Sequence, residues 1–307
     1  MPDPVAGAGE VLLDIAATAV NRADLAQRVG NYPPPPGASD ILGLEAAGTI
    51  RAIGPGVTGW STGDRVMALL AGGGYAEQVA VPAGQLLPVP AGMDLVTAAA
   101  IPEVFTTAWM ALSHRACLRA GEHLLVHAAA SGVGTAAVQM GREMGAAVVA
   151  ASRDPGRLDV ARAMGAEHGL TTADGAFAEA LHGLLPRGVD VVLDLVGPGW
   201  WDENVSCLAP GGRIVMLSLM TGRTAPVDFA RLMPRQAALH VASLRLTDPG
   251  LKAGLVQGFG QWGLDRLADN RLRPVIARVL PLADAGTAHA LLEGTPVTGK
   301  IVLEVTG

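Results

Sequence analysis

The stretch that decides the fold is HLLVHAAASGVGTAAVQMGREM, residues 123–144. Its apolar start, HLLVHA, predicts a strand, and GVGTAAVQMGREM predicts a helix after a turn of small residues. Strand, small-residue turn and helix form the setting in which a dinucleotide-binding fingerprint occurs. The ideal glycine positions hold Ala129, Ser131 and Gly134, with Gly132 as an additional glycine. Such a turn lets a pyrophosphate approach backbone N–H groups at the helix start. The alternative is close strand–helix packing without a ligand.

The chain around this motif alternates apolar strands with helical segments. The predicted strands are 147–151, 189–195 and 212–217, and the predicted helices are 155–164 and 201–208. Continuous apolar strands separated by helices are typical of a parallel sheet that is covered on both faces. This part of the chain therefore predicts an α/β fold with a doubly wound parallel sheet.

The N-terminal part has a different texture. Short strand candidates are separated by Gly- and Pro-rich turns, and these strands are 10–20, 46–53, 64–69 and 74–81. A short helix is predicted after Asn21, and four prolines follow Tyr32. This spacing predicts an antiparallel β domain. The C-terminal end predicts two helices and a final strand, at 250–271, 284–293 and 299–305.

Composition excludes several classes of protein. The net charge is −6 and only 16% of the 307 residues are charged. The mean hydropathy of +0.36 would suit a membrane protein, but we find neither an uninterrupted apolar run of about 18 residues nor a signal peptide. An acidic pI of about 5.6 without a long basic run argues against nucleic acid as a partner. Two cysteines, Cys117 and Cys207, give no disulfide framework, so we expect a cytoplasmic protein.

Searches for metal and nucleophile motifs return little. His123 and His127 have H-x-x-x-H spacing within the predicted strand HLLVHA, and no histidine pairs with a cysteine at zinc-binding spacing. No G-x-S-x-G elbow is present. We therefore predict no metal site, and an enzyme of this design would take its chemistry from a cofactor.

The end of the strand at 147–151 bears on which cofactor that is. An acidic residue there would accept hydrogen bonds from an adenosine ribose, but the chain has Ser152, Arg153 and Arg157. A hydroxyl and two cations favour the 2′-phosphate of NADPH over NADH. The alternative is that both arginines are solvated and paired with Asp154 and Asp159.

Five separated segments now show a family resemblance. They are NRADLAQRVGNYPPPPGASDILGLEAAG (21–48), AAAIPEVFTTAW (98–109), HAAASGVGTAAVQ (127–139), VDVVLDLVG (189–197) and GKIVLE (299–304). Together they resemble the zinc-free quinone oxidoreductase branch of the medium-chain dehydrogenase/reductase superfamily, nearest the p53-inducible type. The resemblance implies a GroES-like catalytic domain over 1–98 and 247–307 and a Rossmann NADP(H)-binding domain over 99–246.

Departures from the family pattern also matter. Zinc-containing relatives carry a cysteine near the position of Asn21 and a histidine where this chain has Leu44, within Gly43-Leu44-Glu45. The resemblance therefore implies no catalytic zinc. The family usually begins with a further β-hairpin before the strand at 10–20, so we expect a less covered sheet edge there. Relatives often carry a tyrosine near Thr172 that contacts the adenosine end of the cofactor.

The resemblance also carries over site residues. Asn21 and Tyr32 match catalytic residues of the substrate cleft. The cofactor-binding residues predicted by motif or resemblance are Thr107, Ser131, Gly132, Val133, Gly134, Ser152, Arg153, Arg157, Leu217, Leu219, Met220 and Lys300. Each of three residues has a simpler alternative: Asn21 caps a helix, Tyr32 stacks on the prolines, and Lys300 lies on the surface.

The resulting hypothesis is an NADPH-dependent quinone oxidoreductase that reduces quinones or related conjugated carbonyls. Two alternatives stay open: an NADPH-dependent enone or enoyl reductase that reduces a C=C bond, and a crystallin-like NADPH-binding protein of low turnover. The resemblance also implies a homodimer joined through the edge strand at 240–246.

Overall fold

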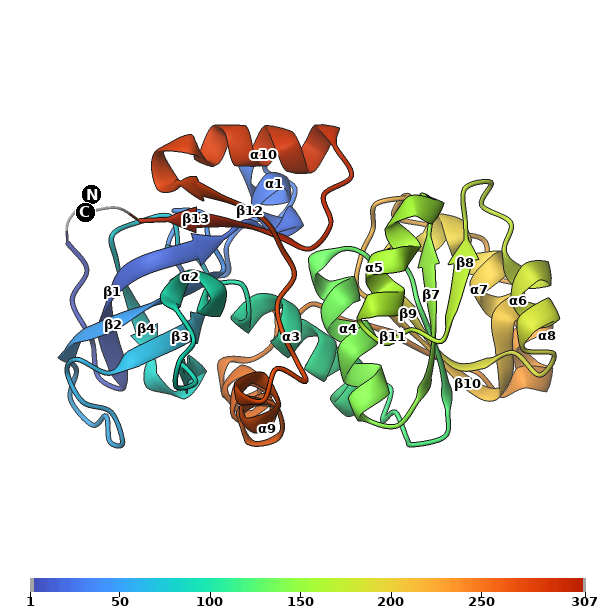
Figure 1. The fold of residues 1–307 in the computed structure, drawn as a ribbon, viewed down its shortest axis with the longest axis horizontal. Helices are drawn as coiled ribbons and strands as arrows, with labels where there is room; N and C mark the ends of the chain where they lie inside the picture. The colour runs from blue at the N-terminus through green and yellow to red at the C-terminus, as the bar shows by residue number, and fades with distance from the viewer. Residues whose placement is uncertain (1–2, 306–307) are drawn as a thin grey trace. The chain divides into compact units, whose positions relative to one another are not determined.

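A computed structural model describes residues 3–305 of the chain. The chain divides into two compact units (Figure 1). Unit 1 runs up to Thr106 and resumes at Leu244, and unit 2 is Thr107–Ser243. The predicted domain boundaries, 98/99 and 246/247, lie near these positions.

Unit 2 contains a six-stranded parallel sheet. Its strand order is β11-β10-β9-β6-β7-β8, and every neighbouring pair is parallel. The strands are β6 (His123–Val126), β7 (Ala147–Ser152), β8 (His168–Thr171), β9 (Val189–Asp194), β10 (Leu208–Met216) and β11 (Ala238–Val241). From β6 the chain runs outward through β7 to β8, then returns to β9 on the other side of β6 and runs outward again. This reversal between β6 and β9 defines a doubly wound dinucleotide-binding sheet.

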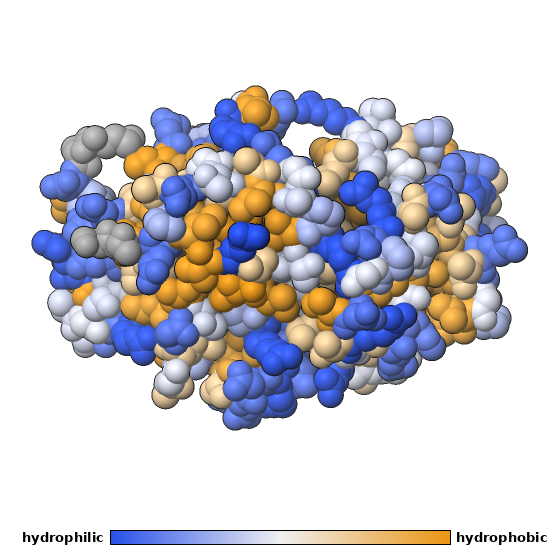
Figure 2. All heavy atoms as spheres, turned by 45° about the horizontal axis from the view of Figure 1, so that its top comes forward, coloured by the Kyte–Doolittle hydropathy of each residue, from blue (hydrophilic) through white to orange (hydrophobic). Residues whose placement is uncertain are grey.

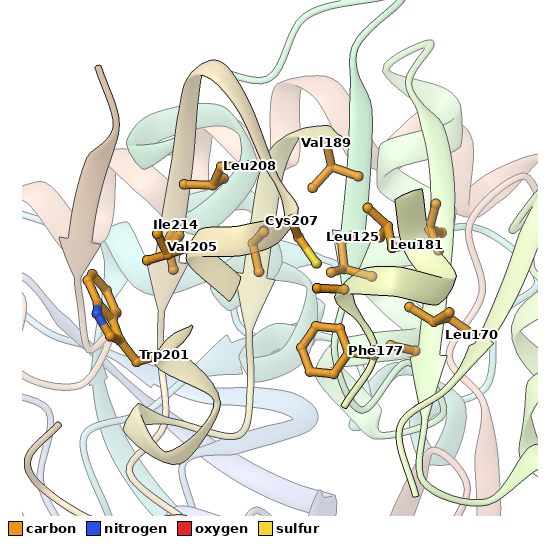
Figure 3. Close-up of a cluster of buried hydrophobic side chains, with 14 of the residues drawn as sticks. Leu125, Leu170, Phe177, Leu181, Val189, Trp201, Val205, Cys207, Leu208 and Ile214 are labelled. Atoms are coloured by element: carbon orange, nitrogen blue, oxygen red, sulfur yellow. The ribbon is translucent and has the colours of Figure 1, made fainter. Parts of the chain in front are cut away.

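Helices cover both faces of this sheet. In Figure 1, α4 (Gly132–Glu143) and α5 (Leu158–Ala163) lie on one face. The helices on the other face are α6 (Ala178–Leu184), α7 (Trp201–Cys207) and α8 (Phe229–Leu232). Between α6, α7 and the sheet, Figure 3 shows Leu125, Phe177 and Cys207 directed into one buried cluster. Full burial of such side chains stabilises the unit by about 1.5–3 kcal/mol each. The positive mean hydropathy thus reflects, in part, a sheet that is buried on both sides.

Unit 1 is built on a seven-stranded sheet in the order β12-β13-β1-β2-β3-β5, with β4 also paired to β1. The strands are β1 (Glu10–Ala19), β2 (Glu45–Ile53), β3 (Arg65–Leu69), β4 (Gln78–Pro82), β5 (Leu86–Pro88), β12 (Ile276–Pro281) and β13 (Lys300–Glu304). All pairs are antiparallel except β12 with β13. On the side opposite β2, strand β1 pairs with β4 at its start and with β13 at its end. The expected uncovered edge is therefore not on the first strand.

The helices of unit 1 are α1 (Arg22–Arg28), α2 (Leu95–Ala98), α9 (Pro249–Ala268) and α10 (Ala285–Gly294), and α3 (Pro102–Trp109) begins in unit 1 and ends in unit 2. The segment Leu95–Arg115, which continues beyond α3 as a π-helical turn (Met110–Arg115), is long and apolar enough to cross a membrane by composition alone. This segment was not identified from the sequence, because it is not an uninterrupted apolar run. Sixty-seven per cent of its most apolar window is buried inside the structure, as in a core helix.

Most predicted elements are present, with informative differences. Strand β6 ends at Val126 rather than Ala128, because Ala128 has a φ of 46°, which an extended strand does not allow. Strand β11 covers Ala238–Val241 rather than 240–246, and the following Leu244 and Arg245 are buried in unit 1. Strand β12 was not predicted, because its residues are mostly exposed and show no apolar alternation.

Some of the apolar residues that raise the mean hydropathy are exposed to solvent. Figure 2 shows hydrophobic residues among hydrophilic ones over one face of the molecule. In the C-terminal half of unit 2, Phe229 is 71% exposed, Met233 77% and Val241 67%. Scattered exposed apolar residues are normal, but several within one short segment indicate a surface suited to a partner.

Candidate active site

The nucleotide turn lies at the N-terminus of α4. Ser131 is the N-cap, and its Oγ accepts a hydrogen bond from the amide of Gly134 at 3.1 Å. The amides of Gly132 and Val133 make no hydrogen bond within residues 3–305, and both residues are half-buried rather than enclosed. A 12-residue helix thus presents two free N–H donors and the positive end of its dipole, which is a suitable site for a pyrophosphate.

Gly134 explains why the turn needs a glycine. A Cβ on this residue would lie 2.3 Å from the carbonyl oxygen of Ala128 and 2.8 Å from the Cα of Ala129. The helix therefore approaches the end of β6 as closely as backbone permits. The close packing of strand and helix that the alternative interpretation requires is therefore present. The same packing brings the free amides to the carboxyl end of the sheet, where doubly wound folds bind their ligands.

The residues after β7 differ in availability. Ser152 is only 5% exposed, and its Oγ donates to the carbonyl of Asp154 at 2.9 Å and accepts from the Asp154 amide at 3.2 Å. Arg153 is exposed and makes no hydrogen bond or ion pair within the described residues. Arg157 donates to the carbonyl of Ala130 at 3.3 Å, in the nucleotide turn itself. Asp159 pairs with Arg162 rather than with Arg157. Arg157 thus contacts the nucleotide turn, and a contact of Arg153 or Arg157 with an adenosine phosphate remains a prediction.

A buried polar chain supports the same end of the sheet. Asp194, at the end of β9, accepts hydrogen bonds from the amides of Val196 and Gly197, both at 2.8 Å, and from Asn204 Nδ2 at 3.0 Å. Since the Asn204 amide nitrogen donates to Asp194, its Oδ1 accepts from His127 Nε2 at 2.6 Å. Burial lowers the pKa of His127 to about 4 and raises the pKa of Asp194 to about 6. His127 is therefore neutral at physiological pH.

The remaining predicted cofactor residues of unit 2 lie on α3 and after β10. Thr107, on α3, is 9% exposed. The amide of Leu217 donates to the carbonyl of Asp194 at 2.9 Å, so this loop continues from the same edge of the sheet. Leu219 and Met220 are each 54% exposed. Their contact with a cofactor remains a prediction.

Unit 1 contains a second cluster, and it is made of buried charges. Glu45, on β2, and Lys300, on β13, form an ion pair of 2.7 Å between side chains that are 0% and 4% exposed. Lys300 also donates to Asn21 Oδ1 at 2.5 Å and to the carbonyl of Val20 at 2.8 Å. The surface alternative for Lys300 is therefore wrong.

Asn21 is the centre of this cluster. Its Nδ2 donates to Glu45 Oε1 at 2.9 Å and to the carbonyl of Ala19 at 3.2 Å, and its Oδ1 accepts from Lys300. It is also the N-cap of α1, where its backbone N–H donates to Asp24 Oδ2 at 2.8 Å in a capping box. The side-chain amide is therefore engaged inside the unit, and a contact between Asn21 and a substrate remains a prediction.

A hydrogen-bonded chain leads from this cluster toward α10. A guanidinium cannot accept a hydrogen bond, so Arg28 donates to His289 Nδ1 at 3.3 Å. His289 Nε2 then donates to the Tyr75 hydroxyl at 3.0 Å, and Tyr75 donates to Asp24 Oδ2 at 3.4 Å. Burial raises the pKa of both Asp24 and Tyr75. The chain fixes the tautomer of His289 and holds Asp24 against α1.

Tyr32 lies in a different setting from the one that stacking on prolines implies. The guanidinium carbon of Arg245 is 5.3 Å from the centre of the Tyr32 ring, a cation–π distance. Arg245 donates to the carbonyls of Tyr32 and Ala71. Lys252, on α9, is 4% exposed and donates to the carbonyl of Arg245 at 3.0 Å. Two buried cations thus hold the loop that carries Tyr32.

Sequence reasoning missed Glu103. It lies in the first turn of α3, and its amide donates to Glu45 Oε2 at 2.9 Å. Burial raises the pKa of its carboxyl group to about 8. A signal was present, because Glu103 is the only acidic residue in the apolar stretch Leu95–Arg115.

The residues present do not fit a catalytic zinc ion. No group of three His, Cys, Asp or Glu side chains capable of holding a metal occurs among residues 3–305. Leu44 stands at the position of the zinc-ligand histidine, and the oxygens of Asn21, near the position of the zinc-ligand cysteine, and of Glu45 are bound by the ammonium of Lys300. The Lys300 ammonium thus takes the place that a metal cation would need between these oxygens.

The fold and the two clusters define a class of protein, a doubly wound dinucleotide-binding unit joined to an antiparallel β unit. Comparison with known proteins agrees. Residues 7–91 match the alcohol dehydrogenase GroES-like domain family, and residues 132–249 match the zinc-binding dehydrogenase family. The quinone oxidoreductase of Thermus thermophilus, whose structure includes an NADPH complex, is 38% identical with a TM-score of 0.83, covering 99% of this chain and 94% of that one. The chain belongs to the medium-chain dehydrogenase/reductase superfamily, and the predicted fold class is confirmed.

Other relatives carry a second activity in their names. The JamJ enoyl reductase structure is 27% identical with a TM-score of 0.88, covering 100% of this chain and 94% of that one. Polyketide synthase GfsB of Streptomyces halstedii is 35% identical over 285 residues, which is 92% of this chain and 4% of that protein. The chain thus spans a small fraction of the polyketide synthases that it matches. The proteins similar to this chain thus include a quinone oxidoreductase and an enoyl reductase.

Proposed function

We propose that this protein is an NADPH-dependent reductase of quinones or related conjugated carbonyls, from the zinc-free quinone oxidoreductase branch. The observation that carries the proposal is the end of β7, where Arg153 is exposed and unpaired within the described residues and no carboxylate follows the strand directly. An unpaired guanidinium there suits a 2′-phosphate, whereas NADH would call for an acidic residue. NADPH supplies a hydride when bound.

The chain's own residues would bind and orient the reactants. The free amides of Gly132 and Val133 suit the pyrophosphate. The loop of Tyr32, held by Arg245, and the Asn21 cluster are the acceptor-side residues of the proposal. Since no metal polarises the acceptor in this scheme, rate depends on alignment and on exclusion of water.

Steady-state kinetics tests the proposal directly. The purified chain is assayed with NADPH and with NADH against a benzoquinone. We expect NADPH oxidation to exceed NADH oxidation at least tenfold in kcat/KM. Equal rates with the two cofactors would refute the role given to Arg153. Binding of NADPH without turnover of any acceptor would instead favour the low-turnover alternative.

The enone or enoyl reductase is the second candidate. It is favoured by the enoyl reductase JamJ and by the polyketide synthases among the relatives. Both reactions begin with hydride transfer to a conjugated system, so the products distinguish them. Incubation with a quinone and an α,β-unsaturated thioester in parallel, followed by mass spectrometry, should give one dominant reduced product. Saturated thioester as that product would reassign the substrate.

We also propose that the chain forms a homodimer through β11. This strand is at one end of the sheet order, where its outer backbone groups are free to pair. Its Leu239 and Val241 are 47% and 67% exposed. Sedimentation should therefore detect a dimer, and Val241→Lys should weaken it. A wild-type monomer at micromolar concentration would refute this proposal.

A further inference from the structure

One carboxyl group in unit 1 is neither paired nor fully enclosed. Glu103 is half-buried, and its carboxyl makes no hydrogen bond or ion pair within residues 3–305. By contrast, the neighbouring Glu45 is completely buried and binds Lys300, Asn21 and the Glu103 amide. The Glu45 carboxylate is thus bound on all sides by the cluster. Glu103 joins the cluster only through its backbone amide.

The charges around Glu103 come from several elements. Glu45 on β2 and Asp24 on α1 repel its anionic form, whereas Lys300 on β13, Lys252 on α9 and Arg245 favour it. These three cations are already engaged: Lys300 binds Glu45 and Asn21, Lys252 donates to the carbonyl of Arg245, and Arg245 donates to the carbonyls of Tyr32 and Ala71. Burial and the two carboxylates therefore dominate and raise the pKa of Glu103 to about 8. The protonated acid is therefore the favoured form at neutral pH.

The surroundings are those of the predicted acceptor site. Arg245 interacts electrostatically with both Tyr32 and Glu103 and lies against the Tyr32 ring. The Glu103 amide joins the same Glu45 carboxylate that holds Asn21. Glu103 therefore lies among the residues of unit 1 for which a substrate role is predicted.

We propose that the Glu103 carboxyl group supplies the proton of the reduction. This rests on the proposed function. The acceptor gains two electrons and a hydrogen nucleus as hydride from the reduced nicotinamide, which becomes NADP⁺. The resulting anion then takes a proton from Glu103: the O–H bond of the acid breaks, and a new O–H bond forms on a quinone or a C–H bond on an enoyl acceptor. The Glu103 carboxylate regains a proton from water before the next turnover.

Glu103 suits this role better than Tyr32. The Tyr32 ring lies against the Arg245 guanidinium, whereas the Glu103 carboxyl makes no hydrogen bond or ion pair within residues 3–305. Tyr32 would then orient the acceptor.

The test uses the full chain with Glu103→Gln, which keeps the shape and removes the acidic proton. General acid catalysis contributes about 10²–10⁴-fold, so we expect kcat with the best acceptor to fall at least 100-fold while the Kd for NADPH changes less than twofold. Wild-type kcat should decline as pH rises through about 8, and this decline should vanish in the variant. Glu179→Gln is the matched control, an exposed acid in the first turn of α6.

A readout independent of activity is the titration of ¹³C-labelled glutamate carboxyls by NMR. We expect one resonance to titrate near pH 8 in the wild type and to be missing from Glu103→Gln. Circular dichroism checks that both variants fold. An active wild type with unaffected Glu103→Gln kinetics, or a Glu103 resonance that titrates near pH 4, would overturn the assignment alone. A wild type that reduces no acceptor would overturn the proposed function and this assignment with it.

Discussion

The two units build their candidate sites from different materials. In unit 2 the site is backbone: two free amides at the start of α4, a glycine with no room for a Cβ, and small side chains around them. In unit 1 the site is side chains, with Glu45, Lys300 and Asn21 joined inside the sheet and Glu103 attached through its amide. A backbone site tolerates many sequences as long as the residues stay small. A network of buried charges tolerates few, because each member leaves a partner unsatisfied when it is removed.

The largest effect is expected from Lys300→Met. Loss of the ammonium leaves the fully buried Glu45 carboxylate without its cation, and breaking a buried pair in this way costs about 3–5 kcal/mol. Urea unfolding followed by circular dichroism measures the change. Arg51→Met is the control, because it breaks an exposed pair with Asp14 in the same sheet and should cost at most about 1 kcal/mol. The double variant Lys300→Met/Glu45→Gln should recover part of the loss. Equal effects of both single variants would mean that the buried pair of unit 1 is no more sensitive to substitution than an exposed pair.

The buried polar chain of unit 2 predicts a pH dependence. The pKa of His127 is lowered from 6.5 to about 4 in the folded state. Between these pH values the unfolded state binds more protons than the folded state. The contribution of His127 to stability is therefore lost as pH falls from 6.5 to 4. The pKa of Asp194 is raised from 3.8 to about 6, so the folded state holds the extra proton there and stability falls as pH rises. The two contributions oppose each other over the same range.

His127→Gln, which keeps a donor toward Asn204, should expose the Asp194 contribution. As pH falls from 7 to 4.5, wild type loses the His127 contribution and the variant does not. The unfolding free energy of the variant relative to wild type should therefore rise by about 2 kcal/mol over this range, at 1.36 kcal/mol per pKa unit. Urea unfolding at several pH values measures it. His114→Gln removes an exposed imidazole of the same unit as a control. An unchanged pH profile in His127→Gln would mean that His127 is not buried as the structure describes.

Gly134→Ala tests the backbone site. The new methyl group would collide with the carbonyl of Ala128, so α4 has to shift, at a cost of about 1–3 kcal/mol and at least a tenfold higher Kd for NADPH. Gly183→Ala, on α6 with no atom within 4 Å of its Cβ, should instead be neutral or stabilise by up to about 1 kcal/mol. Fluorescence titration with NADPH provides the Kd. Unaltered affinity in Gly134→Ala would argue for packing without ligand binding.

Arg153→Ala should have the smallest effect on stability, within about 0.5 kcal/mol, because the side chain is exposed and unpaired within the described residues. Its effect should appear in cofactor preference, as a roughly tenfold weaker affinity for NADPH and no change for NADH, since one charge-assisted phosphate contact is lost. Arg278→Ala, an exposed arginine on β12, controls for charge alone. A parallel loss for both cofactors would point to general electrostatics.

The sequence predicted the parts of the molecule in which local pattern and tertiary fold agree. Strand β6, helix α4 and strand β9 are close to where the apolar runs indicated. Strand β12 was not predicted because it lies at the end of the sheet order and contains no fully buried residue. Lys300 was identified as a candidate, but whether it faces solvent or interior depends on which strand covers β13, and local sequence does not contain that information.

By itself, the sequence determined the doubly wound sheet, its nucleotide turn and the absence of an acidic residue directly after β7, because spacing and residue size along one segment are enough to specify a backbone site. Only the tertiary structure decided that Lys300 binds Asn21 and Glu45, that Arg245 holds the loop of Tyr32, and that the Glu103 carboxyl has no partner within residues 3–305. These contacts join residues up to 279 positions apart. Their electrostatics depends on burial, which arises only when the distant segments pack together.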